Sequence, residues 1–367
     1  MTKKLIDIIA GARPNFMKIA PIIKAIDARQ TVGGPLRYRL VHTGQHYDEK
    51  MSGTFFRQLG IPNPNINLEV GSGTQAQQTG AIMIGYESLL LEHPADLCLV
   101  VGDVTSTMAC SIASKKLNIL VAHVEAGIRS GDVTMPEEIN RMVTDAITDY
   151  FFTTSEIANE NLRGMGVAKD KIYFVGNTMI DTLLSNMDRL TPPTFWDEFG
   201  LKSKEYFVLT LHRPANVDSN DAFARMLKAV AISTRGEPVV FPVHPRTAKT
   251  LREGTAVPAN LLLVDPQPYL EFNYLVKNAR AVITDSGGIT EETTVMGVPC
   301  MTLRNSTERP ETVSIGTNDL LGIDPNALKP ALDRLFAGQW KRGSIPPLWD
   351  GKTAARIVHA LELILVK

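Results

Sequence analysis

Short apolar runs recur along the whole chain, and longer stretches with helical periodicity separate them. Runs of this kind predict strands that are buried on both faces, and their alternation with helices is typical of parallel sheets covered on both sides. The first series of runs comprises Leu5–Ala10, Tyr38–Thr43, Leu97–Val101, Ile119–Val124 and Ile172–Val175, and the second comprises Tyr206–Leu211, Pro238–Val243, Leu261–Val264, Ala281–Thr284 and Pro299–Leu303. The sequence therefore predicts an α/β protein with two doubly wound halves.

The length also favours two domains. A chain of 367 residues exceeds what one hydrophobic core usually serves. We expect the chain to pass from one half to the other around Asp181–Pro193, which ends in Thr191-Pro192-Pro193. The last helical segment, about Thr353–Lys367, could pack on either half.

Charge and composition exclude some classes of partner. With 44% hydrophobic residues and a formal net charge of -1, the chain has no electrostatic signature of a protein that binds nucleic acid or an anionic membrane. No apolar run is long enough to span a bilayer. The first run contains Asp7 and predicts a buried strand rather than a signal peptide. We therefore expect a cytoplasmic protein in which a few placed groups bind any anionic ligand.

Cysteine and histidine spacing gives little support for a metal site. Cys98, Cys110 and Cys300 lie in apolar surroundings without C-x-x-C spacing, which indicates small core residues in a reducing compartment. His42 and His46 are four residues apart but flank Gly44 in a predicted loop, and no H-E-x-x-H motif occurs. We expect no metal.

The residues that follow the first run could bind an anion. In open parallel sheets, ligands bind beyond the carboxyl ends of the strands. Pro14 suits the first turn of a helix, whose free N–H groups and positive dipole end favour an anion. Arg13 precedes this helix and Lys18 lies one turn into it, so both could contact a phosphate, although basic residues at such positions are usually only solvated. The dinucleotide pattern G-x-G-x-x-G is absent.

Two acidic residues follow later runs of the first series. Asp103 comes after Leu97–Val101, where it either presents a carboxylate to the site or caps the next helix. Glu125 continues an otherwise apolar run, and strand interiors disfavour Glu. A buried carboxylate requires a partner and can have a shifted pKa, which suits a general acid or base. We favour a functional Glu125 over a structural ion pair with Arg129.

A third acid, Glu137, lies beside Pro136, which opens a predicted helix. The apolar residues that keep helical spacing in this segment are Ile139, Met142, Val143, Ala146 and Tyr150. Acids in a first turn ordinarily interact with the helix dipole, and Glu137 could also pair with Arg141 four residues later. On this segment alone, the structural explanation is preferred.

The second series carries the clearest nucleotide-binding signal. Ser286-Gly287-Gly288 follows the run Ala281–Thr284 and Asp285 and precedes a predicted helix over Ile289–Met296. Such a turn gives the backbone close access to a phosphate and adds a hydroxyl donor. Glu291 and Glu292 lie one turn on, where a carboxylate could accept hydrogen bonds from ribose hydroxyls. His212 follows another run beside Arg213, a pair that suits contact with a charged oxygen, although a lone His is more often structural.

Taken together, these segments resemble the UDP-N-acetylglucosamine 2-epimerase family over nearly the whole chain. The matching motifs are Gly11-Ala12-Arg13-Pro14 with Lys18, Gly102-Asp103, His123–Gly127, Pro136-Glu137-Glu138 with Asn140-Arg141, Val175-Gly176-Asn177, Thr284–Gly288 and Thr307–Glu311. The resemblance implies two Rossmann-like domains that face each other across a cleft, as in the glycosyltransferase-B fold. It also implies that the last helix returns to the first domain, so we expect domains over residues 1–180 plus 351–367 and over 181–350.

The resemblance assigns roles to residues that match the motifs of the family. The implied catalytic residues are Asp103, Glu125, Glu137 and His212. The implied substrate-binding residues are Arg13 and Lys18 in the first domain, Gln267 and Phe272 on the uridine side, Ser286, Gly287 and Gly288 at the diphosphate, Glu292 at the ribose and Arg309 as a further phosphate-side cation. The family also implies a homodimer and requires no cofactor.

The implied activity is reversible conversion of UDP-N-acetylglucosamine to UDP-N-acetylmannosamine, for the synthesis of surface polysaccharide precursors. Residues 43–47 resemble the branch of the family that does not hydrolyse its product. By contrast, this chain has Pro214-Ala215 where the family commonly has Glu after its His-Arg-Arg. The alternatives are a hydrolysing 2-epimerase, an epimerase of a related UDP-2-acetamido sugar such as a uronate, a glycosyltransferase of the same fold, and a sensor that binds UDP without chemistry.

Overall fold

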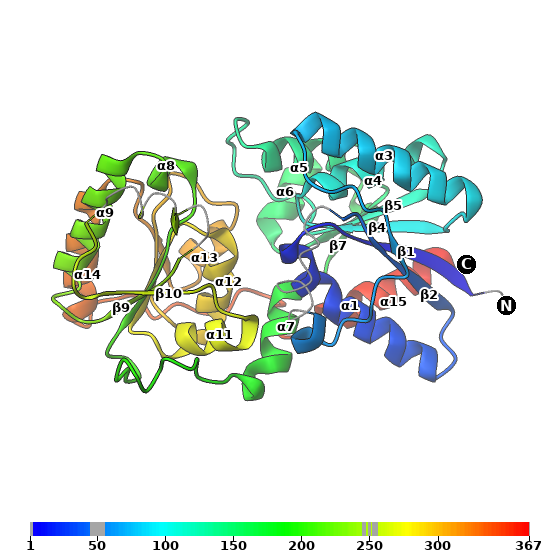
Figure 1. Ribbon diagram of the computed structural model, residues 1–367. Helices are drawn as coiled ribbons and strands as arrows, with labels where there is room; N and C mark the ends of the chain where they lie inside the picture. Colours follow the sequence, from blue (N-terminus) through cyan, green and yellow to red (C-terminus); the bar gives the residue numbers. More distant parts are fainter. Residues whose placement is uncertain (1–2, 45–55, 244–246, 249–250, 252–255, 367) are drawn as a thin grey trace. The chain divides into compact units, whose positions relative to one another are not determined.

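The computed structural model describes residues 3–44, 56–243, 247, 248, 251 and 256–366, apart from the side chains of Arg13, Pro214 and Ala215. The chain divides into two compact units (Figure 1). Unit 1 comprises Met1–Ser185 and Pro347–Lys367, and unit 2 comprises Asn186–Pro346. The domain bounds expected from the family resemblance, 1–180 plus 351–367 and 181–350, stay a prediction.

Unit 1 is built on a seven-stranded sheet. Its strands are β1 (Lys4–Ala10), β2 (Leu36–His42), β3 (Ile66–Asn67), β4 (Leu97–Val101), β5 (Leu120–Val124), β6 (Tyr150–Thr153) and β7 (Ile172–Phe174). They lie in the order β3-β2-β1-β4-β5-β6-β7, and every pairing is parallel. The burial of all five side chains of β4 agrees with its apolar sequence, because helices cover both faces of a parallel sheet.

The helices of unit 1 lie on both faces of this sheet (Figure 1). They are α1 (Arg13–Thr31), α3 (Gln75–Glu92), α4 (Thr105–Lys116), α5 (Pro136–Ile147), α6 (Glu156–Gly164), α7 (Thr178–Asn186) and α15 (Thr353–Leu365). Helix α15 packs on α1, where Arg29 Nε donates to Glu362 Oε1 at 2.8 Å. The final helix therefore belongs to unit 1. On the opposite face, α3 and α4 form a core with β4.

Unit 2 repeats the arrangement with six parallel strands. The strands are β8 (Phe207–Thr210), β9 (Val239–Pro242), β10 (Leu261–Val264), β11 (Ala281–Thr284), β12 (Cys300–Thr302) and β13 (Asn318–Leu320), in the order β10-β9-β8-β11-β12-β13. The helices are α8 (Pro214–Val217), α9 (Asn220–Ser233), α11 (Tyr269–Asn278), α12 (Gly287–Met296), α13 (Pro310–Ser314) and α14 (Leu328–Phe336). Helices α9 and α14 pack together on one face, and α11 packs with α12 on the other.

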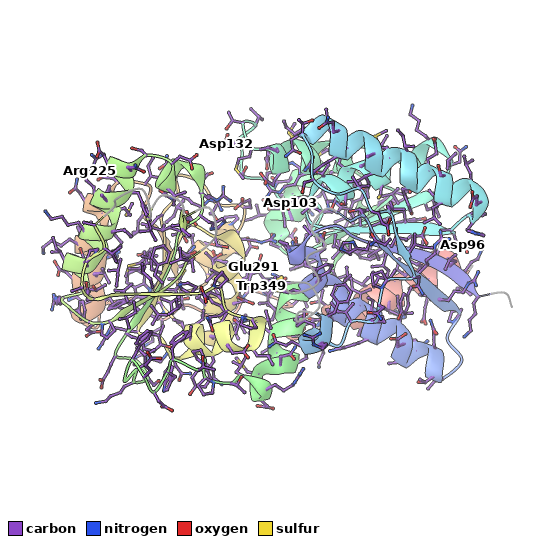
Figure 2. All side chains as sticks on the ribbon, in the orientation of Figure 1. Asp96, Asp103, Asp132, Arg225, Glu291 and Trp349 are labelled. Carbon is purple, nitrogen blue, oxygen red and sulfur yellow. The ribbon has the colours of Figure 1, made fainter. Side chains whose placement is uncertain are left out.

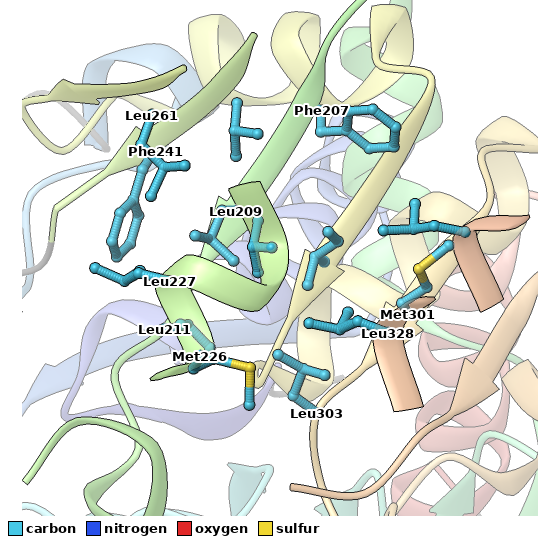
Figure 3. Close-up of a cluster of buried hydrophobic side chains, with 14 of the residues drawn as sticks. Phe207, Leu209, Leu211, Met226, Leu227, Phe241, Leu261, Met301, Leu303 and Leu328 are labelled. Carbon is cyan, nitrogen blue, oxygen red and sulfur yellow. The ribbon is translucent and has the colours of Figure 1, made fainter. Parts of the chain in front are cut away.

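Each face of the second sheet has its own apolar core. Figure 3 shows the core beneath α9 and α14, where Leu209 and Phe241 of the strands meet Leu227 and Leu328 of the helices. A second cluster lies beneath α11 and includes Tyr206, whose hydroxyl donates to the Leu275 carbonyl at 2.5 Å. Two covered faces explain why strands such as β9 and β11 are apolar along their length rather than alternating between apolar and polar residues.

The strand order reverses at one point in each sheet, and this fixes where a site can form. Strands β1 and β4 are adjacent in unit 1, and β8 and β11 are adjacent in unit 2. The helices that follow two such strands leave on opposite faces, so the carboxyl ends of the strands border a crevice that binds ligands in this class of fold. Arg13, Asp103, His212 and Ser286, which were singled out from the sequence, follow these four strands.

Helix α5 corrects an expectation from sequence periodicity. The apolar residues with helical spacing ordinarily form a buried face, yet Ile139 and Met142 are 49% and 46% exposed. The buried residues of α5 are Glu138, Asn140, Arg141, Thr144 and Asp145. The helix ends at Ile147, and Tyr150 instead begins strand β6. Helix α5 thus turns its polar face toward the inside of unit 1.

In the described part of the chain, no helix is both long and apolar enough to cross a lipid bilayer.

Candidate active site

The most constrained acid of unit 1 is Glu125, directly after β5. Its backbone adopts φ 70°, a left-handed conformation that non-glycine residues rarely adopt. The N–H groups of Glu125 and Ala126 both donate to the Phe152 carbonyl, at 3.0 and 3.2 Å. The side chain is buried, and its Oε2 lies 2.5 Å from Lys18 Nζ. The strained backbone therefore directs a buried carboxylate toward a buried ammonium group.

Glu125 contacts Lys18 and not Arg129, which was the ion-pair partner in the structural explanation of this residue. The Arg129 guanidinium instead binds Asp145 Oδ2 at 2.7 Å. Lys18 comes from α1, which follows β1, whereas Glu125 follows β5, so the two strand ends jointly place the pair. Two residues predicted separately from the sequence are thus brought together.

Gly102 makes this arrangement sterically feasible. It follows β4 with φ 66°, and a Cβ added there would lie 2.8 Å from Lys18 Nζ and 3.4 Å from Glu125 Oε2. A side chain at this position would therefore both strain the backbone and displace the ion pair.

Asp103, the next residue, is labelled in Figure 2, and two side chains of α5 hold it in place. Its carboxylate forms an ion pair with Arg141 Nη2, and its carbonyl accepts from Asn140 Nδ2 at 2.8 Å. The residue that caps α4 is Val104, without a side-chain cap, so Asp103 does not act as the helix cap. With its side chain 28% exposed, Asp103 presents a fixed carboxylate at the end of β4.

The two consecutive acids of α5 have different environments. Glu138 is buried and accepts from the backbone N–H groups of Ser130 and Gly131, at 3.0 and 3.1 Å, and from Arg141 at 2.7 Å. Burial opposes ionisation, but these hydrogen bonds outweigh it and lower the pKa of Glu138. Glu137, the predicted catalytic acid, is exposed in the first turn. Glu138 therefore anchors the loop and Arg141, and Glu137 is the accessible acid.

A buried network of hydrogen bonds and ion pairs holds the turns that carry these acids. His123 Nδ1 lies 2.7 Å from Asp145 Oδ1, and His123 Nε2 lies 2.8 Å from the Gly102 carbonyl. Asp145 Oδ2 accepts from the Gly127 N–H at 3.0 Å and pairs with Arg129. Burial alone would raise the pKa of Asp145, but the hydrogen bonds and charges of His123 and Arg129 lower it. One carboxylate thus links the turns that carry Asp103 and Glu125.

In unit 2, the start of α12 lies beside a buried ion pair. Ser286 is the N-cap residue, and no side-chain hydrogen bond caps the helix. A Cβ on Gly287 would lie 3.4 Å from Glu308 Oε2 and 3.5 Å from Arg304 Nη1. Arg304 and Glu308 form two hydrogen bonds of 2.7 and 2.8 Å. Because Ser286, Gly287 and Gly288 are only partly buried, a helix N-terminus suited to an anion remains accessible.

The carboxylates one turn into α12 are buried. Glu292 Oε1 accepts from Asn273 Nδ2 of α11 at 3.3 Å. Glu291, labelled in Figure 2, forms an ion pair with Arg309, so the predicted phosphate-side cation is bound to an acid of the same unit. Phe272 is partly buried against the core, and the Gln267 side chain donates to the Asp265 carbonyl at 2.7 Å. All of these groups follow strands β10, β11 and β12 at the carboxyl edge of the sheet.

Burial raises the pKa of Glu292 to about 7, against the opposing hydrogen bonds from Asn273 and Tyr269. An acid with a raised pKa binds its proton more tightly in the folded state, so the free energy of unfolding should fall as pH rises from 4.5 to about 7. Glu292→Gln should therefore be more stable than the wild type above this window, by on the order of 3 kcal/mol, and similar to it below. Thermal unfolding across pH measures the difference.

The control for this stability prediction is Glu160→Gln, because Glu160 is exposed on α6. It should leave the pH profile of unfolding unchanged. A Glu292→Gln protein whose stability runs parallel to that of the wild type at every pH would contradict a raised pKa.

His212 lies where β8 ends, and its Nδ1 is 2.8 Å from Asp285 Oδ1 after β11. The predicted site residues of unit 2 are thus gathered at one sheet edge, and those of unit 1 at another. The Arg13 side chain and residues 45–47, including His46, lie outside the described residues. Sequence reasoning gave no role to Asp145 or Asp285 and assigned Arg141 none beyond pairing with Glu137. Asp285 had a usable signal, because it directly follows an apolar strand.

The fold and these two clusters define a two-domain α/β enzyme with polar groups at the carboxyl edge of each sheet. A family model described as UDP-N-acetylglucosamine 2-epimerase matches residues 29–362. The UDP-N-acetylglucosamine 2-epimerase of Methanocaldococcus jannaschii is 40% identical over 97% of this chain and 98% of its own. The UDP-2,3-diacetamido-2,3-dideoxy-D-glucuronate 2-epimerase of Pseudomonas aeruginosa is 40% identical over 86% of this chain and 87% of its own.

A solved structure shows the same similarity in three dimensions. The M. jannaschii UDP-GlcNAc 2-epimerase in complex with UDP-GlcNAc and UDP matches with a TM-score of 0.88 and 39% identity, over 98% of this chain and 99% of that one. The chain belongs to the UDP-N-acetylglucosamine 2-epimerase family. This confirms the family resemblance and the predicted fold class. A calicheamicin glycosyltransferase, with a TM-score of 0.57 and 14% identity, shares the fold alone.

Proposed function

We propose that this protein interconverts UDP-N-acetylglucosamine and UDP-N-acetylmannosamine without hydrolysing the product. Membership of the epimerase family supports the reaction class. The observation that carries the proposal is Glu125, a buried carboxylate on a strained backbone that contacts Lys18 beside Gly102 and Asp103. A pre-positioned acid of this kind suits proton transfer at a carbon atom.

The chemistry accounts for both clusters of polar groups. The C2 hydrogen of an N-acetylhexosamine has no adjacent carbonyl, so its direct removal is costly. Loss of the C2 proton together with cleavage of the bond between C1 and the UDP oxygen gives a glycal and free UDP. Re-addition of UDP at C1, with a proton delivered to the other face of C2, gives the epimer. The reaction requires acids around C1 and C2 and stabilisation of the departing diphosphate.

We assign the predicted residues to these two tasks. Asp103, Glu125 and Glu137 serve the proton transfers, with His212 as a further catalytic group. Ser286, Gly287, Gly288 and Arg309 stabilise the diphosphate together with Arg13 and Lys18, while Glu292, Gln267 and Phe272 bind the uridine part. The accessible N-terminus of α12 supports the diphosphate assignment.

A second candidate substrate is a related UDP-2-acetamido uronate. It is favoured by the 40% identity to the P. aeruginosa enzyme named for such a sugar. Both substrates share the UDP and the 2-acetamido group, so the same acids would act on either one.

Proton NMR of the purified protein with UDP-N-acetylglucosamine in D2O tests the proposal. We expect UDP-N-acetylmannosamine to appear, with deuterium at C2 of both sugars. Accumulation of free N-acetylmannosamine and UDP would instead identify a hydrolysing enzyme. If neither change occurs, the same assay with the diacetamido uronate distinguishes the second substrate from a protein without epimerase activity.

We further propose that the protein acts in the cytoplasm as a homodimer. Exposed apolar residues lie on α5 and also on α3, where Ile84 and Leu91 are 68% and 67% exposed, and they support a protein partner for unit 1. Light scattering after gel filtration should give the mass of a dimer, and Met142→Glu should shift it toward the monomer. A monomeric wild type would contradict the homodimer.

A further inference from the structure

Asp285 and His212 follow two adjacent parallel strands. Strand β8 pairs with β11 so that Thr210 lies opposite Thr284, and the chain continues from these residues to His212 and Asp285. The Asp285 side chain is fully buried, whereas the His212 side chain is 42% exposed. The imidazole therefore rests on a buried carboxylate and extends from it toward the surface of unit 2.

The two oxygens of Asp285 share the His212 N–H as a donor but otherwise have different partners. Oδ2 accepts from the backbone N–H groups of His212 and Arg213, at 3.0 and 2.9 Å, and from Asn216 Nδ2 at 3.0 Å. Oδ1 lies 2.8 Å from His212 Nδ1 and 3.2 Å from the His212 N–H. Backbone donors thus fix the carboxylate through Oδ2, and Oδ1 is directed at the ring.

The ionised state of Asp285 determines the direction of the bond to His212. Burial opposes ionisation, but the hydrogen bonds from His212, Asn216 and Arg213 lower the pKa of Asp285. An ionised carboxylate can only accept hydrogen bonds. The proton shared between Oδ1 and the ring must therefore come from Nδ1.

We propose that Asp285 is a positioning residue that keeps the proton of the neutral His212 ring on Nδ1, so that His212 exchanges protons with a sugar nucleotide through Nε2. The proposal rests on the proposed function, in which His212 acts on the substrate. It also explains which ring nitrogen is free to act: Nδ1 faces the fixed carboxylate and carries the proton, so Nε2 is left as the acceptor.

Asp285→Asn tests the proposal with little change in shape. If the amide oxygen takes the place of Oδ2, it keeps the three donors described above. The amide NH2 then takes the place of Oδ1 and donates to Nδ1, which forces the neutral ring to carry its proton on Nε2. The variant reverses one hydrogen bond and otherwise removes only the longer contact from the His212 N–H to Oδ1.

The first readout is independent of activity. Nitrogen-15 NMR of the ring nitrogens, assigned by the signals that His212→Gln removes, reports which nitrogen is protonated in the neutral ring. We expect Nδ1 in the wild type and Nε2 in Asp285→Asn. A wild-type ring that carries its proton on Nε2 would overturn the proposal, whether or not the protein is an epimerase.

The second readout is steady-state kinetics. Asp285→Asn should lower kcat by about 10²–10⁴-fold, the range for loss of a correctly protonated catalytic group, with a much smaller change in KM. Asn216→Ala is the control, because it removes one donor to Oδ2 but leaves the contact between Oδ1 and the ring. It should lower stability and keep the proton on Nδ1.

The outcomes separate the proposal from the proposed function. Reversal of the ring proton with wild-type kcat would overturn the positioning role and leave the epimerase assignment intact. Equal losses of kcat in Asp285→Asn and Asn216→Ala, without reversal of the ring proton, would reduce Asp285 to a structural residue and overturn the proposal. The positioning role is supported if Asp285→Asn moves the ring proton to Nε2 and if it alone of the two variants loses kcat.

Discussion

Glu125→Gln should lower kcat for epimerisation by about 10³-fold, because an amide cannot take up or deliver a proton at C2. The substitution keeps the shape of the side chain and removes only its charge. It should also lower the stability of unit 1, since Lys18 is 9% exposed and loses the carboxylate that it contacts at 2.5 Å. Kinetics and thermal unfolding of the same preparation measure the two effects.

A double variant separates catalysis from this ion pair. Lys18→Met with Glu125→Gln removes both members and fills the volume with apolar atoms, so we expect recovery of much of the lost stability. Activity should not recover, because neither change restores an acid. If the double variant regained both stability and turnover, the role of Glu125 would be structural.

Asp145→Ala should lower the free energy of unfolding of unit 1 by about 3–5 kcal/mol, the cost of removing one partner from a buried charge network. The change leaves His123 without the oxygen 2.7 Å from its Nδ1 and leaves Arg129 without its carboxylate. It also frees the N–H of Gly127. Urea unfolding at neutral pH measures the loss. Glu156→Ala, which removes a half-exposed pair with Arg163, should cost less than about 1 kcal/mol.

The pH dependence provides a second test of Asp145. Because the folded-state pKa of Asp145 lies below its ordinary value of 3.8, the carboxylate contributes its full stability above that value. The contribution is lost as pH falls below 3.8 and through the lowered pKa. The stability difference between wild type and Asp145→Ala should therefore be constant near neutrality and shrink in acid. If the stability difference between the two proteins grew in acid, the stabilising role of the ionised Asp145 would be contradicted.

The sequence predicted the fold well because both sheets are parallel and covered. Strands β4, β10 and β11 were predicted with the bounds that the structure has, since each is a continuous apolar run between polar turns. Strand β6 was missed because only two residues separate it from α5, and the helical spacing of apolar residues appeared to continue through Tyr150. The two-residue strand β3 is too short to leave any periodic signal.

The candidate site was predictable only in part. Asp103 and Glu125 stand out because a carboxylate at the end of an apolar strand is unusual. Their partners are not encoded locally, because Lys18 and Arg141 reach them from helices that follow other strands. The choice of Lys18 over Arg129 as the partner of Glu125 depends on the left-handed backbone of Glu125, which no spacing pattern reveals.

Helix α5 also has a consequence for protein engineering. A common stabilisation strategy replaces polar residues at buried helix positions with leucine and replaces exposed apolar residues with charged ones. On α5 the first step would remove Arg141, which holds Asp103, and Asp145, which holds His123. Along this helix, the apolar positions should therefore tolerate substitution better than the polar positions. A deep mutational scan should find the conspicuous apolar positions permissive for the monomer fold and the inward polar positions nearly invariant.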